Sequence, residues 1–172
     1  MDASVFKQMF MPHSRRMYAT AWRLTADAQA AEDLVQEAFL KLWMKRDSLN
    51  KVENTEAFCT TIVRNIFFDR YRKNGNRFVE QPPEKLNIAD DSNISEQLEH
   101  RENAIKVMNI IARLPEQQRL IITLRDIEDL SYSEIAAQTG LQAINIRVLL
   151  SRARKQIREQ FNKQTEYERR RD

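Results

Sequence analysis

The residues best suited to chemistry in this chain lie between Gln142 and Arg158, where five side chains are basic and none is acidic. Arginine, asparagine, glutamine and serine can donate hydrogen bonds to the edges of DNA bases, and cations can hold phosphates. A helix that is merely solvated usually alternates acids with bases, so the absence of acids favours a surface that binds a polyanion. The residues predicted to face DNA are Gln142, Asn145, Arg147, Val148, Ser151, Arg152 and Lys155.

The elements around this segment would present it to duplex DNA. Ser131 and Glu134 have the spacing of a capping box, which starts a helix, and Gly140 has the conformational freedom to end that helix in a tight turn. The pattern predicts a helix-turn-helix in which the second helix is a recognition helix. The apolar stripe expected on the inner side of the recognition helix consists of Ile146, Leu149, Ala153 and Ile157.

A second group of residues suited to nucleic acid lies on the helix expected from Thr55 to Lys73. One side of this helix is apolar and is expected to face the core. Aromatic rings among cations can hold the unstacked bases of single-stranded DNA, so the other side is predicted to bind melted DNA. Its two rings leave an alternative open, which is packing against the preceding helix. The residues of this second side are Arg64, Asn65, Phe68, Tyr71 and Arg72.

The preceding helix is expected to have an outer face that mixes acids with apolar residues. Its members are Asp33, Gln36, Glu37 and Leu40, with Met44 nearby. Exposed apolar residues beside acids are typical of a surface that binds another protein. Single exposed apolar residues are also common where nothing binds, and that alternative stays open.

No residue pattern predicts a catalytic residue, a cofactor or a metal site. Cys59 is expected on the core face, while His13 and His100 lie far apart in the sequence, and neither has a paired carboxylate or nucleophile. No glycine-rich phosphate loop occurs. The single cysteine and the lack of a signal peptide or long apolar run predict a cytoplasmic protein that does not insert into a membrane.

The composition predicts an all-α fold of two small helical domains joined by a flexible linker. Only 2 glycines and 4 prolines occur in 172 residues, too few for the turns of a many-stranded sheet. The linker contains two adjacent prolines, more acidic than basic residues and no sustained periodicity. The predicted parts are residues 1–75, the linker 76–94 and the helix-turn-helix domain 95–172.

The residues taken alone leave more than one function open. A free-standing helix-turn-helix transcriptional regulator with a helical dimerisation domain would bind a palindromic operator tightly without any partner. A helical adaptor that binds only proteins would support no promoter-dependent transcription. A subunit that both reads duplex DNA and traps melted DNA would use both of the predicted DNA faces.

Several short motifs, in their order along the chain, resemble one known family. Their order and spacing are similar to those of the extracytoplasmic-function sigma factors of the sigma-70 family across nearly the whole chain. The motifs are Ala31-Glu32-Asp33-Leu34-Val35-Gln36-Glu37 with Phe39, Arg64-Asn65 with Asp69 and Arg72, Leu114-Pro115-Glu116, Leu130-Ser131-Tyr132 with Glu134-Ile135-Ala136, and Leu150-Ser151-Arg152-Ala153-Arg154.

The resemblance implies a non-enzymatic subunit that carries core RNA polymerase to specific promoters and stabilises promoter melting. The outer face around Asp33, Gln36 and Glu37 would dock on the clamp helices of the polymerase β′ subunit. The melted-DNA face, with the loop from Leu49 to Thr55, would capture bases of the minus-ten element. The carboxy-terminal domain would sit on the β-subunit flap and read the minus-thirty-five element. An anti-sigma factor is a further partner that the resemblance implies.

Overall fold

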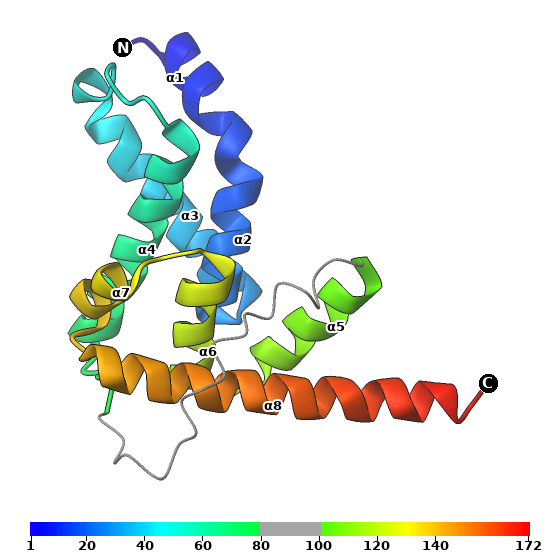
Figure 1. Cartoon of the computed structure of the whole chain (residues 1–172). Helices are drawn as coiled ribbons and strands as arrows, with labels where there is room; N and C mark the ends of the chain where they lie inside the picture. Colours follow the sequence, from blue (N-terminus) through cyan, green and yellow to red (C-terminus); the bar gives the residue numbers. More distant parts are fainter. Residues whose placement is uncertain (80–100) are drawn as a thin grey trace. The chain divides into compact units, whose positions relative to one another are not determined.

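The computed structural model describes residues 1–79 and 101–172, which form helices joined by short turns (Figure 1). They divide into two compact units, Met1–Arg77 and Phe78–Asp172. The prediction of an all-α chain with two small helical domains is therefore confirmed. The predicted linker lies outside the described residues except for residues 76–79.

The first unit is built from helices that pack side by side around an apolar core. Its elements are α1 (Ala3–Phe10), η1 (Met11–His13), α2 (Ser14–Thr25), α3 (Ala28–Met44), η2 (Arg46–Ser48) and α4 (Thr55–Lys73). Helix α2 contacts both α3 and α4, and these two also contact each other (Figure 1). Met17, Leu34 and Val63, one from each of these helices, are among the fully buried residues of the core.

Polar side chains start the helices of this unit at defined residues. Asp2, Asp27 and Asn54 each accept a hydrogen bond from the backbone N–H three residues later, at 2.8–2.9 Å. Such N-caps satisfy a backbone donor that has no partner within the helix. Helix α4 begins directly after Asn54 and ends before Gly75, which has a positive φ of 79°. The helix predicted from Thr55 to Lys73 is confirmed.

The second unit is arranged around one long helix. Its elements are α5 (Arg101–Ala112), α6 (Glu116–Ile122), η4 (Thr123–Ile127), α7 (Tyr132–Thr139) and α8 (Ala143–Arg169). Helices α5, α6 and α7 all contact α8 (Figure 1). Ile121, Leu124, Ile146 and Leu150 are among the buried apolar residues of this unit. The long helix thus supplies one side of the core over its amino-terminal part.

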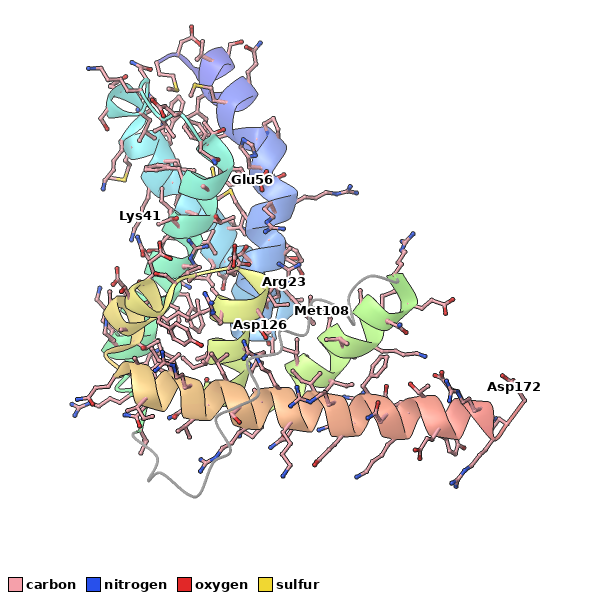
Figure 2. All side chains as sticks on the ribbon, in the orientation of Figure 1. Arg23, Lys41, Glu56, Met108, Asp126 and Asp172 are labelled. Carbon is pink, nitrogen blue, oxygen red and sulfur yellow. The ribbon has the colours of Figure 1, made fainter. Side chains whose placement is uncertain are left out.

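Helix α6 runs directly into η4, which is a single π-helical turn. Within it the N–H of Glu128 donates to the carbonyl oxygen of Thr123 at 2.9 Å, five residues earlier. A π turn inserts one extra residue into a helix and often occurs at functional sites. Local residue spacing does not indicate this turn. Two of its residues reach neighbouring elements: Arg125 contacts α7, and Asp126, labelled in Figure 2, contacts α8.

Candidate nucleic-acid and partner interfaces

The predicted helix-turn-helix is present in the second unit. Ser131 Oγ accepts a hydrogen bond from the N–H of Glu134 at 3.1 Å, and Glu134 Oε2 accepts one from the N–H of Ser131 at 2.7 Å. Helix α7 ends at Gly140, whose φ of 76° lies in the left-handed region, and its N–H donates to the Ala136 carbonyl at 2.8 Å. The capping box and the glycine turn are therefore confirmed.

Helix α8 presents most of the predicted DNA-facing residues at or near the surface. The predicted inner stripe, Ile146, Leu149, Ala153 and Ile157, is buried. Opposite it lies a polar face that begins at the N-cap residue, Gln142. The exposed members are Gln142, Arg147 and Lys155, and the half-buried members are Asn145, Ser151 and Arg152.

Val148 does not have the exposure that was predicted for it. Its side chain is only 2% exposed, although the helical period places it on the side of α8 away from the inner stripe. Periodicity gives the direction in which a side chain leaves its helix, but it does not reveal what else covers that direction. In this structure Val148 is therefore not accessible to a thymine methyl group.

Arg154, one of the five basic residues of the acid-free segment, is not part of the DNA-facing surface. Its guanidinium makes two hydrogen bonds to the Asp126 carboxylate, at 2.8 and 3.0 Å. The side chains of Arg154 and Asp126 are 6% and 0% exposed. Burial of a charge requires a partner of this kind. The ion pair joins η4 to α8 and places Arg154 in the interior of the unit.

The polar members of the melted-DNA face are accessible on α4. Asn65 and Arg72 are exposed and Arg64 is half-buried. Arg64 donates a hydrogen bond to Thr61 Oγ1 at 3.0 Å, and Arg72 forms an ion pair with Asp69 at 2.7 Å. The helical period places Arg64, Asn65 and Arg72 on the side away from the core residues of α4.

The two aromatic residues of this face are buried, which contradicts the prediction of an exposed pair. Phe68 is 1% and Tyr71 7% exposed. The ring of Phe67 contacts both, with its centroid 5.0 Å from that of Phe68 and 6.0 Å from that of Tyr71. Rings at these separations attract each other and shield one another from water. The two rings are therefore buried and in contact with a third ring of the same helix.

Glu37 on α3 is held by two cations of its own unit. Its carboxylate forms ion pairs with Arg70 of α4 and with Lys41. Partial burial acts to raise the pKa of Glu37, but the hydrogen bonds and charges of Arg70 and Lys41 outweigh it, so the pKa lies below its ordinary value. The charge of Glu37 therefore also links α3 to α4.

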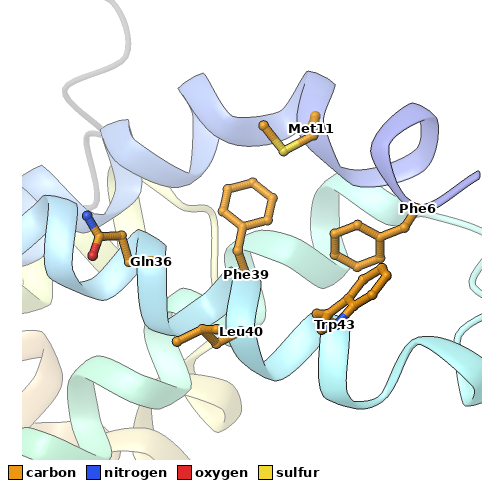
Figure 3. A pocket seen from close by; sticks show the side chains of 6 residues that line it. All are labelled: Phe6, Met11, Gln36, Phe39, Leu40 and Trp43. Atoms are coloured by element: carbon orange, nitrogen blue, oxygen red, sulfur yellow. The ribbon is translucent and has the colours of Figure 1, made fainter. Parts of the chain in front are cut away.

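Beside the predicted partner face lies an apolar groove that the sequence analysis did not find. The groove has a volume of about 520 Å³ and lies between α3 and the α1–η1 segment. In Figure 3, Phe39 points toward Met11, and the rings of Phe6 and Trp43 meet at a centroid distance of 5.1 Å. The lining residues are Phe6, Met11, Gln36, Phe39, Leu40 and Trp43.

Two predicted partner-face residues, Gln36 and Leu40, are thus also groove residues. Leu40 is 63% and the neighbouring Met44 79% exposed. Asp33 is exposed on the same outer side of α3. The face therefore combines the exposed Asp33, the paired Glu37, one amide and a set of apolar side chains larger than the sequence indicated. The other groove residues are apolar and are spread over α1, η1 and α3, so their sequence positions alone do not show that they form one surface.

The described residues show no other site suited to chemistry. Burial raises the pKa of the Cys59 thiol to about 11, so the thiol is protonated at neutral pH. Residues 1–79 and 101–172 contain no group of acidic, histidine or cysteine side chains that could hold a metal ion. No helix within these two ranges is both long enough and apolar enough to cross a bilayer.

Comparison with protein families gives one match for each unit. Residues 9–77 match the family described as sigma-70 region 2, and residues 104–157 match the family described as sigma-70, region 4. The first match contains α2, α3 and α4 with the partner and melted-DNA faces. The second contains the helix-turn-helix. Matches to both regions in one chain do not favour a free-standing helix-turn-helix regulator.

Individual relatives extend over most of the chain. The ECF RNA polymerase sigma factor SigE of Mycolicibacterium smegmatis is 32% identical over an alignment of 160 residues, and the match covers 91% of this chain and 61% of SigE. The chain thus spans less than two thirds of that relative. The RNA polymerase sigma-H factor of Pseudomonas aeruginosa is 28% identical over 91% of this chain and 86% of its own length.

A solved structure agrees with these relatives. The sigma factor RpoE of Bartonella quintana, determined in complex with the anti-sigma factor NepR, has a TM-score of 0.56 and 28% sequence identity, and the match covers 93% of this chain and 98% of RpoE. Both family regions, the relatives and this structure point in one direction. The chain belongs to the sigma-70 family, and its relatives include extracytoplasmic-function sigma factors.

Proposed function

We propose that this chain acts in the cytoplasm, where it carries core RNA polymerase to a particular set of promoters and stabilises the melted DNA there. One observation carries the proposal. The same chain holds a helix with an apolar and acidic outer face, a neighbouring helix with exposed cations, and a helix-turn-helix with an acid-free recognition segment. These are the surfaces needed to bind a protein, single-stranded DNA and duplex DNA.

The outer face of α3 and its groove would bind the clamp helices of the polymerase β′ subunit. The open groove offers Phe39, Leu40 and Trp43 to apolar side chains of a helix. Asp33 at the edge of the face would pair with a basic side chain of the same helix. An amphipathic helix lying in an apolar groove is a common mode of protein recognition. Glu37 would contribute mainly by fixing α3 on α4, because it already has two cationic partners.

The outer side of α4 would hold the melted minus-ten element. Arg64 and Arg72 would bind phosphates, and Asn65 has an amide that can hydrogen-bond to the edge of a base. The loop from Leu49 to Thr55 precedes α4 and would contribute to the same pocket for bases. Phe68 and Tyr71 are buried here, so stacking on them would require that these rings become uncovered when polymerase and DNA bind.

The second unit would sit on the β-subunit flap and place the start of α8 in the major groove of the minus-thirty-five element. Residues near the amino terminus of a recognition helix reach base edges, and later cations reach phosphates. Asn145, Arg147 and Ser151 belong to the first group and Lys155 to the second. At the position where many family members have Gly-Thr-Val-Lys-Ser-Arg, this chain has residues 144–149 with the sequence Ile-Asn-Ile-Arg-Val-Leu. The promoter sequence that this chain recognises is therefore expected to differ from the sequences that those family members recognise.

Binding two units to one polymerase would supply the affinity that each unit lacks alone. Each DNA face has only a few cations, and a few phosphate contacts give weak, salt-sensitive binding. Tethering both units to polymerase converts the second contact into an intramolecular event at a high effective concentration. Melting would be stabilised by trapping the unstacked bases, and no covalent step or nucleotide hydrolysis is involved.

An anti-sigma factor is a further proposed partner. The related RpoE of Bartonella quintana was determined in complex with such a factor, NepR. In this chain the open groove and the exposed Leu40 and Met44 form an apolar surface that a regulator could cover. A factor bound there would compete with polymerase for the same side chains.

Binding to polymerase is tested with an aspartate placed on the partner face. We expect the wild-type chain to co-elute with sigma-free core polymerase and Leu40→Asp to lose co-elution, because the charge would be buried at the interface. Tyr167→Asp is the matched control, since Leu40 and Tyr167 are both 63% exposed. Failure of the wild-type chain to co-elute at low salt would overturn the proposed function.

The two DNA faces are tested by run-off transcription from a promoter found by mapping start sites after overexpression. Arg64→Ala and Arg147→Ala should each lower open-complex formation at least about fivefold, since each removes a contact to DNA. Arg15→Ala in α2 and Lys163→Ala in α8 remove exposed cations outside the predicted faces and should have little effect. Unchanged open-complex formation in both test variants would contradict the assignment of the faces.

A further inference from the structure

The ring of Tyr132 in the second unit has two guanidinium groups close to it. The Cζ of Arg125 is 4.8 Å and that of Arg147 is 5.1 Å from the ring centroid. Cations within about 6 Å of a ring centroid are attracted by the negative face of the ring. Arg125 belongs to η4, Tyr132 to the first turn of α7 and Arg147 to α8. The stack therefore connects three elements of one unit at the start of the recognition helix.

Arg125 and its neighbour in η4 are held in place by hydrogen bonds. Arg125 Nη1 donates to the carbonyl oxygen of Leu130 at 2.9 Å. The next residue, Asp126, is held by its buried ion pair with Arg154 of α8. The π turn thus anchors Arg125 to the segment before α7 on one side and to α8 on the other. Arg125 has little freedom to follow a movement of the ring.

The ring of Tyr132 is held in place by the start of α7. Tyr132 directly follows the N-cap Ser131, whose hydroxyl and N–H both bond to Glu134. The ring is half-buried. A ring attached to the first residue of a capped helix, with a fixed guanidinium beside it, is a rigid platform.

The contacts of Arg147 differ from those of Arg125 and Tyr132. Arg147 is exposed, and among residues 1–79 and 101–172 it forms no hydrogen bond or ion pair, so its ring contact is its one directional interaction. A guanidinium held against a ring can still offer its N–H groups to another partner. The edge of a guanidinium can donate two parallel hydrogen bonds to O6 and N7 of guanine.

We propose that Tyr132 is a positioning residue that holds the Arg147 guanidinium in the orientation needed to read a guanine in the major groove. The inference rests on the proposed function, since it requires that α8 enters duplex DNA. A long exposed side chain loses rotamer freedom when it binds, and a platform that orders it beforehand reduces this loss. The stack thereby contributes to specificity at one base pair and leaves general phosphate binding to other residues.

The experiment measures base preference with the full chain bound to core polymerase. Duplexes randomised in the upstream element are selected by wild type, Tyr132→Phe, Tyr132→Leu and Arg147→Ala, and the bound DNA is sequenced. Arg147→Ala should lower the guanine preference at one position by at least about tenfold. Tyr132→Leu should lower it severalfold at that same position, and Tyr132→Phe, which keeps the ring face, should retain it.

Two further variants separate positioning from a general structural role. In an Arg147→Ala background, Tyr132→Leu should cause no additional loss at that position, because the platform then has nothing to hold. Tyr167→Leu removes another tyrosine that stacks on an arginine, Arg171 at 5.6 Å, far along α8 from the recognition segment. This control should leave the preference unchanged.

The possible outcomes separate the positioning role of Tyr132 from the proposed function. If Tyr132→Leu weakens binding equally on all sequences, or leaves the guanine preference intact, the positioning role is wrong. If Arg147→Ala lowers binding uniformly, Arg147 holds a phosphate and the inference is also wrong. Both results leave the proposed function standing. If the wild-type chain with polymerase selects no upstream sequence at all, the proposed function itself fails.

Discussion

Two arginines of α8 that lie seven residues apart in the sequence have opposite environments. Arg147 is exposed and stacks on Tyr132, whereas Arg154 is buried and bonded twice to Asp126. Both belong to the acid-free segment, and their side chains are chemically identical. Their contacts assign one to the surface that would meet DNA and the other to the interior of the unit.

Removing one partner of the buried pair should destabilise the second unit strongly. Asp126→Ala is expected to lower its free energy of unfolding by about 3–5 kcal/mol, because Arg154 is left as an uncompensated buried charge. Native-state hydrogen exchange of the α8 amides measures the loss in this unit alone. The control is Asp69→Ala in the first unit, measured on the α4 amides, which breaks an ion pair whose side chains are both 54% exposed and should lower the stability of that unit by less than about 1 kcal/mol. Equal losses in the two variants would contradict the structural role of Arg154.

Cys59 should react slowly in the folded chain. Burial, with a smaller contribution from Glu56, raises the pKa of its thiol from 9.0 to about 11. Because the thiolate is the reactive form, iodoacetamide at pH 8 should label the folded chain at least about a hundredfold more slowly than the chain in urea. As the pH rises from about 9 to about 11, the unfolded thiol ionises first, so the stability of the fold should fall. Equal labelling rates in the two states would show that Cys59 is not buried.

At the scale of the helices, two C-cap residues have left-handed backbone but differ in strain. Ala26, directly after α2, has a φ of 52°, and Gly140, directly after α7, has a φ of 76°. Left-handed backbone crowds the Cβ of an alanine against the following carbonyl oxygen, whereas glycine has no Cβ. The end of α2 is therefore strained and the end of α7 is not.

Exchanging these residue types should shift stability in opposite directions. Ala26→Gly should raise, and Gly140→Ala lower, the free energy of unfolding of the respective unit by about 0.5–1 kcal/mol. The strain of about 1–2 kcal/mol is partly offset by the lower chain entropy of unfolded alanine. A Cβ at Gly140 would meet nothing within 4 Å, so no clash adds to the effect. Hydrogen exchange within each unit measures both shifts, and a stabilising Gly140→Ala would contradict the reasoning.

At the scale of the whole molecule, the chain consists of two compact units, and the two family matches assign a different sigma-70 region to each. Neither DNA face alone has many cations available. In the recognition segment Arg154 is bonded to the buried Asp126, and on α4 Arg72 is paired with Asp69. Activity should therefore depend on the covalent connection between the units when both are bound to polymerase.

Cutting that connection should abolish activity at low concentration. With a specific protease site placed between residues 84 and 92, cleavage of the purified chain should lower open-complex formation with core polymerase by about a hundredfold or more at nanomolar concentration. The same two fragments at high micromolar concentration should restore part of the activity, because the loss lies in effective concentration. An uncut sample of the same protein is the control. Full activity of the cut chain at nanomolar concentration would show that the units act independently.

Features that depend on residues close together in the chain were predictable. Asn54 and Gly75 bound the helix from Thr55 to Lys73, and Ser131 with Glu134 starts α7. Apolar residues at helical spacing identified the buried stripe of α8. The same helical spacing indicated which polar, charged and apolar residues share the sides of the helices that were predicted to face DNA or a partner. Caps, turns and helical periods involve residues at most a few positions apart, so the sequence displays them directly.

The tertiary structure alone decided the environment of individual side chains. It pairs Arg154 with Asp126, 28 residues away, and brings Phe6 against Trp43 to form the groove. It also covers Phe68 and Val148, which periodicity alone would have left exposed. A helical period states the direction of each side chain about its own axis. What that side chain meets depends on other elements that the chain brings there only by folding, and local spacing carries no record of them.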